Sequence, residues 1–152
     1  MPIHFYLRYR FRTVHGNLYL SATNQGIVLS HNPDAEGQWV LRPSQNGHGC
    51  FIHSAGRQTH VLLANGDREQ LTLAEIWETD RHKWQLFEIN HQDVLVVALI
   101  LNQRIDNRLM CAEVQGGNVA PNTPVILFSI AHGQSGHLTY NQLWRPEIVG
   151  PA

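Results

Sequence analysis

Histidine is the residue in this sequence best suited to chemistry near neutral pH, and the chain of 152 residues contains ten. Imidazole titrates near physiological pH and is a common metal ligand. However, no two histidines have the His-Glu-x-x-His spacing of a zinc peptidase, and His132 and His137 have no cysteine or carboxylate nearby in sequence. We therefore expect no metal and no other cofactor. We expect the histidines to make ligand binding acid-sensitive between about pH 7 and about pH 5.5.

Catalytic motifs are missing from the sequence. It contains no Gly-x-Ser-x-Gly elbow, no phosphate-binding P-loop and no glycine-rich dinucleotide turn. Cys50 and His53 form one thiol–imidazole pair, but residues three apart on a strand point to opposite faces. Acidic pairs such as Asp67 and Glu69 lie in predicted turns, where solvated carboxylates are common. The sequence predicts a protein that is not an enzyme.

Composition limits the kind of protein that positions these side chains. Hydrophobic residues make up 43% of the chain and charged residues 15%, which is typical of one folded domain. The formal net charge of -1 excludes a broad positive field for nucleic acid. The two cysteines cannot form a disulfide framework, and the longest apolar run, Val94–Leu101, is too short to insert across a membrane. The N-terminus has no apolar signal-peptide core, so we expect a cytoplasmic protein, with unconventional release left open.

The dominant hydrophobic period is two, which indicates strands. Near the N-terminus the apolar residues Phe5, Leu7, Tyr9 and Phe11 alternate mainly with arginines, predicting a half-buried strand with a solvated basic face. Short apolar runs then recur between turn-forming residues. The expected strands are residues 5–11, 18–22, 27–30, 39–41, 50–53, 61–64, 71–74, 84–89, 94–101, 109–114, 125–128 and 144–148.

These strands fall into three repeats of four, at approximately residues 3–46, 47–90 and 91–149 within a single domain, 1–152. Each repeat closes on a strand that begins with tryptophan: Trp39, Trp84 or Trp144. A unit of four strands cannot bury both of its faces alone, so three units must share one core. Three repeats of four strands that share one core predict an all-β fold, the β-trefoil, with one core tryptophan per repeat. A capping-box pattern at Thr72–Glu75 is an alternative signal for a helix, but the repeat register favours a strand there.

The third repeat resembles a repeat of the ricin B-type (R-type) lectin family. The resemblance is carried by Cys111-Ala-Glu-Val and the glycine turn after it, by Pro124-Val-Ile-Leu-Phe, and by the closing Asn141-Gln-Leu-Trp. It covers roughly 40 residues, and the other two repeats match in architecture alone. The resemblance implies a carbohydrate-binding β-trefoil, similar to the cysteine-poor fungal and bacterial members of the family.

The resemblance also implies which residues bind a sugar. The carboxylate position falls on Glu113, the aromatic platform on Phe128, and the closing polar pair on Asn141 and Gln142. Carboxylates and amides match the hydrogen bonding of hydroxyl groups, and a ring covers the C–H face of a pyranose. The backbone at Gly116 can approach a ligand closely. We place His132 beside this site.

This sequence departs from the family pattern at several of these positions. Glu113 replaces Asp, Ile126 replaces Gln and Phe128 replaces Trp, while Ile130 replaces the second cysteine of the usual disulfide. In the other repeats Ser21 and Leu63 occupy the carboxylate position. Two displaced alternatives remain open, with polar contacts from His31 and Asn32 in the first repeat or a platform from Trp77 in the second.

The functional expectation is a non-catalytic lectin that binds galactose-type or related glycans through a shallow site on the third repeat. Agglutination would need several sites or a homo-oligomer. The main alternative is a β-trefoil protease inhibitor acting through a protruding loop, at residues 129–140 or 43–49. A receptor-binding trefoil is a third reading and would require a sizeable exposed apolar patch.

Overall fold

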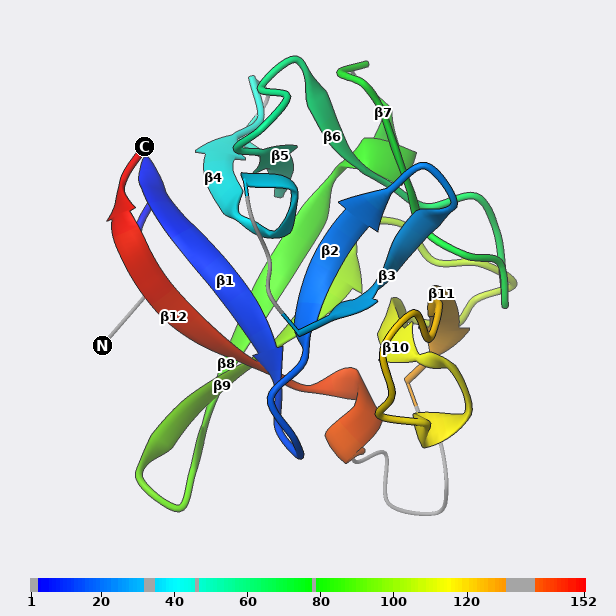
Figure 1. Ribbon diagram of the computed structural model, residues 1–152. Coiled ribbons are helices and arrows are strands. Elements are labelled where there is room, and N and C mark those ends of the chain that lie inside the picture. The colour runs from blue at the N-terminus through cyan, green and yellow to red at the C-terminus, as the bar shows by residue number, and fades with distance from the viewer. Residues whose placement is uncertain (1–2, 32–34, 46, 78, 131–138) are drawn as a thin grey trace.

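The computed structural model describes residues 3–31, 35–45, 47–77, 79–130 and 139–152. They form twelve strands and four short 3-10 helices (Figure 1). None of the helices among these residues is long and apolar enough to cross a membrane. The elements are β1 (Leu7–Thr13), β2 (Tyr19–Thr23), β3 (Gly26–Ser30), η1 (Ala35–Gly37), β4 (Trp39–Pro43), β5 (Cys50–Ser54), β6 (His60–Leu63), β7 (Thr72–Glu75), η2 (Asp80–His82), β8 (Trp84–His91), β9 (Val94–Leu101), β10 (Met110–Val114), η3 (Gln115–Gly117), β11 (Val125–Ser129), η4 (Tyr140–Gln142) and β12 (Trp144–Pro151).

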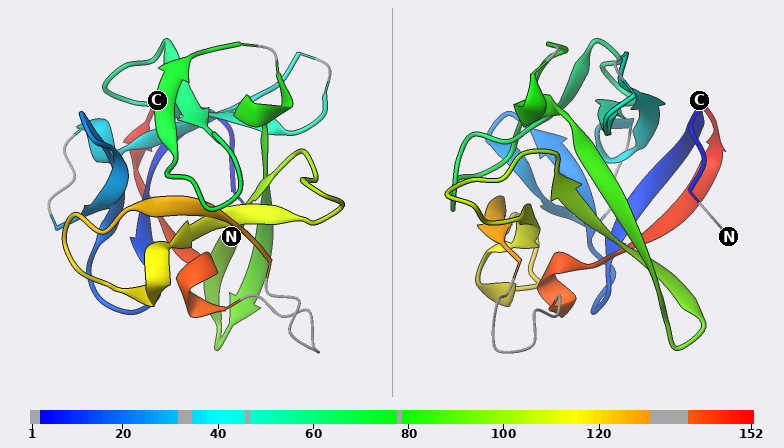
Figure 2. Two further views of the ribbon diagram at one scale, coloured as in Figure 1. Left: turned by 90° about the vertical axis from the view of Figure 1, so that its right-hand side faces the viewer. Right: turned by 180° about the vertical axis from the view of Figure 1, so that it is seen from behind.

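Six of the strands close into a barrel. β1 pairs with β4, β4 with β5, β5 with β8, β8 with β9, β9 with β12, and β12 returns to β1. The remaining strands form the hairpins β2–β3, β6–β7 and β10–β11. The β8–β9 hairpin protrudes from the barrel (Figures 1 and 2). This arrangement is the β-trefoil predicted from the repeats.

The three repeat tryptophans, Trp39, Trp84 and Trp144, are fully buried, which confirms the prediction that they form the core. Each indole N–H donates to a backbone carbonyl in the hairpin of its own repeat. The acceptors are Leu20, Leu62 and Ala112, at 3.0, 3.1 and 3.4 Å. The repeated bond makes these three carbonyls equivalent positions, one per repeat.

The three hairpins meet at one end of the barrel through backbone hydrogen bonds between repeats. The amide of Ile27 donates to the carbonyl of Leu71 (2.9 Å), and the amide of Leu71 donates to the carbonyl of Val125 (2.9 Å). All three side chains are buried in the same core cluster. Since every hairpin bonds to a neighbouring repeat, no repeat completes its hydrogen bonding alone.

Two local expectations are decided by the backbone. The first strand begins at Leu7 rather than Phe5, because Tyr6 has a left-handed backbone (φ 67°) that interrupts the extended chain. Tyr9 and Phe11 face the core as predicted. Residues Thr72–Glu75 form a strand, so the helical alternative is wrong.

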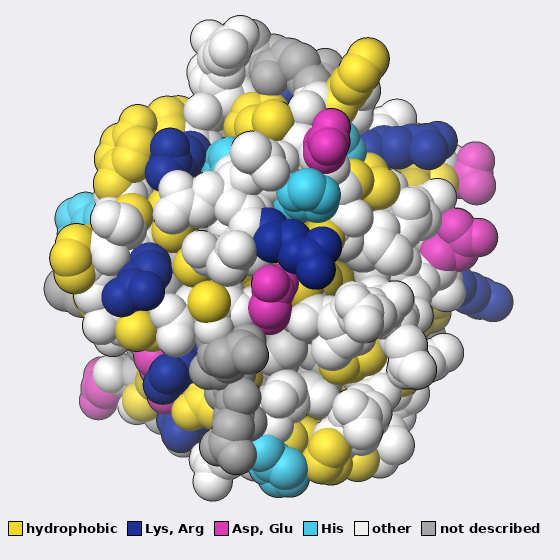
Figure 3. Space-filling model, turned by 45° about the horizontal axis from the view of Figure 1, so that its top comes forward, with side chains coloured by type: hydrophobic (Ala, Val, Ile, Leu, Met, Phe, Trp, Pro, Cys, Tyr) yellow, Lys and Arg dark blue, Asp and Glu magenta, His cyan; other side chains and the backbone are white. Residues whose placement is uncertain are grey.

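The basic face of β1 is partly neutralised. Arg12 Nε lies 3.3 Å from Glu147 Oε2, and the Arg10 guanidinium lies 5.9 Å from the ring centroid of Tyr19. On the face drawn in Figure 3, acidic and basic side chains are interspersed rather than gathered by sign.

Replacing Trp84 by Phe should lower the free energy of unfolding by about 2 kcal/mol or more, since it leaves a cavity and an unpaired Leu62 carbonyl. Trp77→Phe is the matched control, because Trp77 is 70% exposed; it should change stability by less than about 0.5 kcal/mol. Urea unfolding measures both, and equal losses would contradict the assigned role of the buried indole.

Candidate functional site

The residues predicted to bind a ligand come from the hairpin and the last 3-10 helix of the third repeat. Glu113 is on β10, Phe128 on β11, and Asn141 and Gln142 on η4. Cys111 pairs with Phe128 and Glu113 with Ile126, so the side chains of Glu113 and Phe128 share one face of the hairpin. His132 lies outside the described residues.

Glu113 and Gln142 are in direct contact. Gln142 Nε2 donates to Glu113 Oε1 (2.8 Å) and to the Ser129 carbonyl (3.0 Å), while Gln142 Oε1 accepts from the Thr139 amide (3.2 Å). Glu113 is 6% exposed and Gln142 1% exposed. Because both side chains are buried, their contact joins η4 to the hairpin and leaves little of either for a ligand.

Burial sets the electrostatics of this pair. Desolvation raises the pKa of the Glu113 carboxyl, and the hydrogen bond from Gln142 opposes that rise by favouring the charged form. The neighbouring thiol of Cys111 is completely buried. Burial, and secondarily the charge of Glu113, raise the pKa of Cys111.

Asn141 lines a hollow next to η4. The Thr139 hydroxyl donates to Asn141 Oδ1, which orients the amide. Asn141 lines a hollow of about 200 Å³ together with Gly117, Tyr140 and, from the first repeat, His15. Tyr140 is 49% exposed, and its ring centroid lies 4.6 Å from that of His15 in an edge-to-face arrangement. This hollow therefore offers an amide and an accessible aromatic ring at one place.

Sequence reasoning missed Tyr140 and His15. Tyr140 directly precedes the Asn-Gln pair, so its position next to the closing motif was a usable signal. His15 belongs to the first repeat, in the turn between β1 and β2, and no spacing in the sequence brings it to the third. Closure of the barrel places it there, through the pairing of β1 with β12.

The glycine turn after β10 has a left-handed backbone at both glycines. Gly116 and Gly117 both have left-handed conformations, with φ of 63° and 66°. An added Cβ at Gly116 would meet no atom within 4 Å, whereas one at Gly117 would lie 3.9 Å from Asn141 Nδ2. The backbone at Gly116 is thus open to an approaching molecule.

Phe128 is half-buried beneath a cation. The Arg68 guanidinium, from the second repeat, lies 5.4 Å from the centroid of the Phe128 ring. The structure therefore brings Glu113 and Gln142 together, with Asn141 adjacent on η4, and places Phe128 beside Arg68.

The equivalent positions in the other hairpins carry different chemistry. Ser21 pairs with Val28 and Leu63 with Thr72, as Glu113 does with Ile126, so neither hairpin has a carboxylate there. The indole of Trp77 is exposed, and its backbone nitrogen lies 3.0 Å from His82 Nδ1. His31 is exposed, and Asn32 lies outside the described residues.

Within the described ranges, no group of three or more His, Cys, Asp and Glu residues could hold a metal ion. Burial raises the pKa of Cys50 to about 12, so its thiol is protonated at neutral pH and is a poor nucleophile.

Two loops, residues 129–140 and 43–49, were the candidates for protease inhibition, and the structure describes most of the second but little of the first. Residues 131–138 of the longer loop lie outside the described part. The turn after β4 is tied by the Ser44 hydroxyl, which donates to the His48 carbonyl (2.8 Å), and by the Ser44 amide, which donates to the Gly49 carbonyl (3.3 Å).

No family model matches this sequence, and no curated protein does. Solved structures do resemble the fold. A Macrolepiota procera ricin B-like lectin in complex with lactose is 15% identical, with a TM-score of 0.75 and coverage of 97% of this chain and 99% of that one. The designed 3-fold symmetric protein ThreeFoil is 15% identical, with a TM-score of 0.73 and coverage of 91% and 96%. The C-half of an earthworm R-type lectin, in complex with GalNAc, is 11% identical, with a TM-score of 0.66 and coverage of 93% and 98%. At these identities the likeness shows the fold, which is the β-trefoil that ricin B-like lectins share.

Glu113→Gln should stabilise the protein more at about pH 7 than at about pH 4. The raised pKa means that the fold favours the protonated carboxyl, so the stability contributed by this group is present at low pH and is lost as pH rises through the folded pKa. A glutamine imitates the protonated form and still accepts from Gln142. Urea unfolding at both pH values measures the effect. Glu75→Gln, at the exposed end of β7, is the control, and an equal pH dependence in both variants would contradict the prediction.

Proposed function

We propose that this protein is a non-catalytic lectin that binds glycans at the third repeat. The observation that carries the proposal is the hollow at Asn141, Gly117 and Tyr140, placed directly beside the buried Glu113–Gln142 pair. The β-trefoil fold, shared with ricin B-like lectins that bind sugars, supports it.

Each group has a role that follows from its chemistry. The Asn141 amide can donate to a sugar hydroxyl through Nδ2, since its Oδ1 already accepts from Thr139. The ring of Tyr140 can cover the C–H face of a pyranose. Glu113 and Gln142 are positioning residues, because they hold η4 against the hairpin and so fix the amide of Asn141.

We further propose galactose-type glycans as ligands, as the resemblance in the third repeat implies. The hollow of about 200 Å³ is of the size of one sugar ring rather than a long chain. A single shallow site of this kind binds with a Kd of millimolar order, or about -4 kcal/mol. Agglutination would then need further sites or self-association of the chain.

Asn141→Ala and Tyr140→Ala should each weaken glycan binding at least about tenfold, which corresponds to the loss of one good contact worth ~1.4 kcal/mol. A glycan array followed by titration with lactose measures the loss. Phe128→Ala tests the ring implied by the sequence in the same assay. Asn90→Ala, at an exposed position on β8, is the control and should bind as the wild type does. Glycan binding at the third repeat, read from the amide NMR shift of Gly117 on addition of lactose, that survives undiminished in both Asn141→Ala and Tyr140→Ala would refute the third-repeat site.

The protease-inhibitor alternative has a distinct outcome. A panel of serine and cysteine proteases, incubated with the protein, should retain full activity. Inhibition that persists in Asn141→Ala and disappears when residues 131–138 are replaced by a short glycine linker would favour the inhibitor and oppose the lectin.

A further inference from the structure

Arginines gather on the outer face of three neighbouring strands. β1 lies between β12 and β4 (Figure 1). Together these strands hold five of the eleven Lys and Arg residues of the chain but only one of its twelve acidic residues, Glu147. Tyr9, Leu41 and Trp144 belong to the core, and since side chains alternate along a strand, the arginines next to them point outward. This arginine face consists of Arg8, Arg10, Arg12, Arg42 and Arg145.

The arginine face is a row along β1. Arg8, Arg10 and Arg12 are each separated by one residue, which puts the Cα atoms of neighbours roughly 7 Å apart. Arg145 is directly opposite Arg12, at one end of the row. β4 pairs antiparallel with β1 at Arg8, which places Arg42 just beyond the other end. The positive charges therefore follow a line rather than form a compact cluster.

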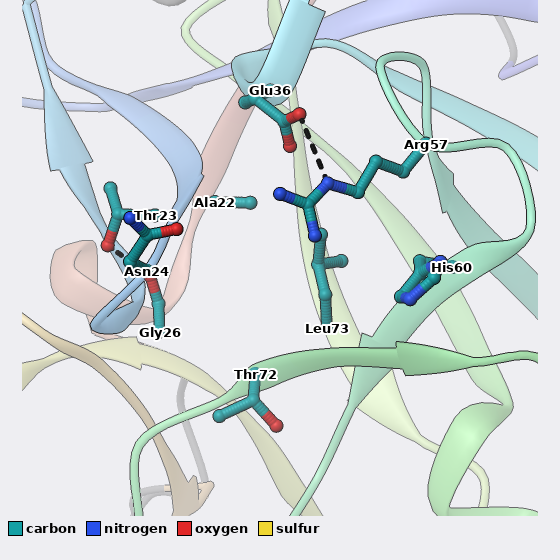
Figure 4. A pocket seen from close by; sticks show the side chains of 9 residues that line it. All are labelled: Ala22, Thr23, Asn24, Gly26, Glu36, Arg57, His60, Thr72 and Leu73. Carbon is teal, nitrogen blue, oxygen red and sulfur yellow. Dashed lines mark hydrogen bonds and ion pairs between the residues drawn. The ribbon is translucent and has the colours of Figure 1, made fainter.

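Most of these charges have no acidic partner. Arg12 Nε lies 3.3 Å from Glu147 Oε2, but no carboxylate among the described residues lies within ion-pair distance of the other four arginines. Arg57, in contrast, lines the recess between the first and second repeats, where its Nε lies 3.6 Å from Glu36 Oε1 (Figure 4). The arginine face is thus an excess of positive charge at one place on a chain whose net charge is slightly negative.

This arrangement is unfavourable for the protein alone. Arg12 and Arg145 are directly opposite each other, and like charges at such positions destabilise a sheet. The Nε donors of Arg8, Arg10, Arg42 and Arg145 are shielded from solvent and have no hydrogen-bond partner among the described residues, which adds a further cost. Departures of this kind are expected where a surface serves function rather than stability. A bound anion would offset the repulsion between the guanidinium groups.

Two tyrosines hold guanidinium groups in place without neutralising them. Arg10 Cζ lies 5.9 Å from the ring centroid of Tyr19, and Arg42 Cζ lies 5.8 Å from that of Tyr6. A ring contacts the flat face of a guanidinium, so the N–H donors in its plane are left for an oxyanion, which they can bind in pairs. All five arginines are half-buried, so ordering them on a ligand costs less entropy than ordering freely extended side chains.

We infer that the arginine face binds a sulfated polysaccharide, whose sulfate groups accept hydrogen bonds from successive guanidinium groups. A line of spaced charges matches a linear chain with repeated anionic groups better than a single ion or the plane of a membrane. Single-stranded nucleic acid also carries repeated anions, but proteins bind it by stacking bases on aromatic rings, and the rings of Tyr6 and Tyr19 are already covered by arginines. The inference does not rest on the third-repeat site.

Isothermal titration calorimetry of the full chain with a heparin octasaccharide tests the inference. The octasaccharide should bind, and its affinity should fall between about 50 mM and about 150 mM salt, because salt screens the charges. Chemical removal of its sulfates should weaken binding at least about tenfold. Arg10→Gln and Arg145→Gln should each weaken binding about tenfold, as expected for one lost charge-assisted contact. Arg57→Gln, which removes a paired arginine outside the arginine face, is the matched control and should bind as the wild type does.

Several results would overturn the inference. They are equal binding of the desulfated octasaccharide, wild-type affinity in both Arg10→Gln and Arg145→Gln, and an equal loss in Arg57→Gln. A single-stranded thymidine oligonucleotide of equal charge that binds as tightly, or binding to phosphatidylserine vesicles alone, would assign the face to another polyanion and reject the sulfated polysaccharide.

Urea unfolding without ligand tests whether the charge serves the fold instead. Arg145→Gln should be at least as stable as the wild type, because it removes a like charge opposite Arg12. A clear loss of stability would give Arg145 a structural role and overturn the inference.

Asn141→Ala separates this site from the one proposed on the third repeat. It should leave the affinity for the octasaccharide unchanged while it reduces the shift of Gly117 on addition of lactose. If Asn141→Ala weakens the octasaccharide as much as Arg10→Gln does, the two ligands share one site and the inference fails. A protein that binds the octasaccharide but shows no lactose shift would refute the third-repeat site and leave this inference standing.

Discussion

The structure depends on one constraint: no repeat can bury its own tryptophan without the other two. Each indole sits in the common core, and its N–H bonds to the hairpin of its repeat, while that hairpin bonds through its backbone to a neighbour. The large buried ring supplies apolar contact, and the single N–H fixes which carbonyl it faces. The strand that begins with the tryptophan and the hairpin that its indole contacts are therefore held in the same relative geometry in all three repeats.

That geometry explains why recesses form at the boundaries between repeats. The core requires similar residues at equivalent inward positions, whereas the recesses just outside it can vary in sequence. The recess between the first and second repeats contains the ion pair of Glu36 and Arg57. The recess between the third and first repeats contains the ring of Tyr140 with the amide of Asn141. Each recess draws on two repeats. A change in one repeat can thus alter the lining of a recess without disturbing the packing of the core.

The Glu113–Gln142 pair shows how a buried polar contact can position residues at the surface. A buried carboxylate is costly unless hydrogen-bonded, and Gln142 supplies a bond at 2.8 Å. The same glutamine also bonds Ser129 and Thr139, so one side chain connects β10, β11 and η4. Asn141 and Tyr140, on the same 3-10 helix as Gln142, are held in position by this contact.

The sequence alone was sufficient to predict the fold. The alternation of apolar and polar residues in the strands and the spacing of the three tryptophans are local signals, and both agree with one shared core. It also predicts sugar-binding residues in the third repeat, and this stays a prediction. It could not reveal that Glu113 and Gln142 face each other, that Arg68 lies over Phe128, or that His15 joins Tyr140 from the first repeat. Those relations depend on closure of the barrel, which brings together residues far apart in the chain, and no local pattern encodes the resulting distances.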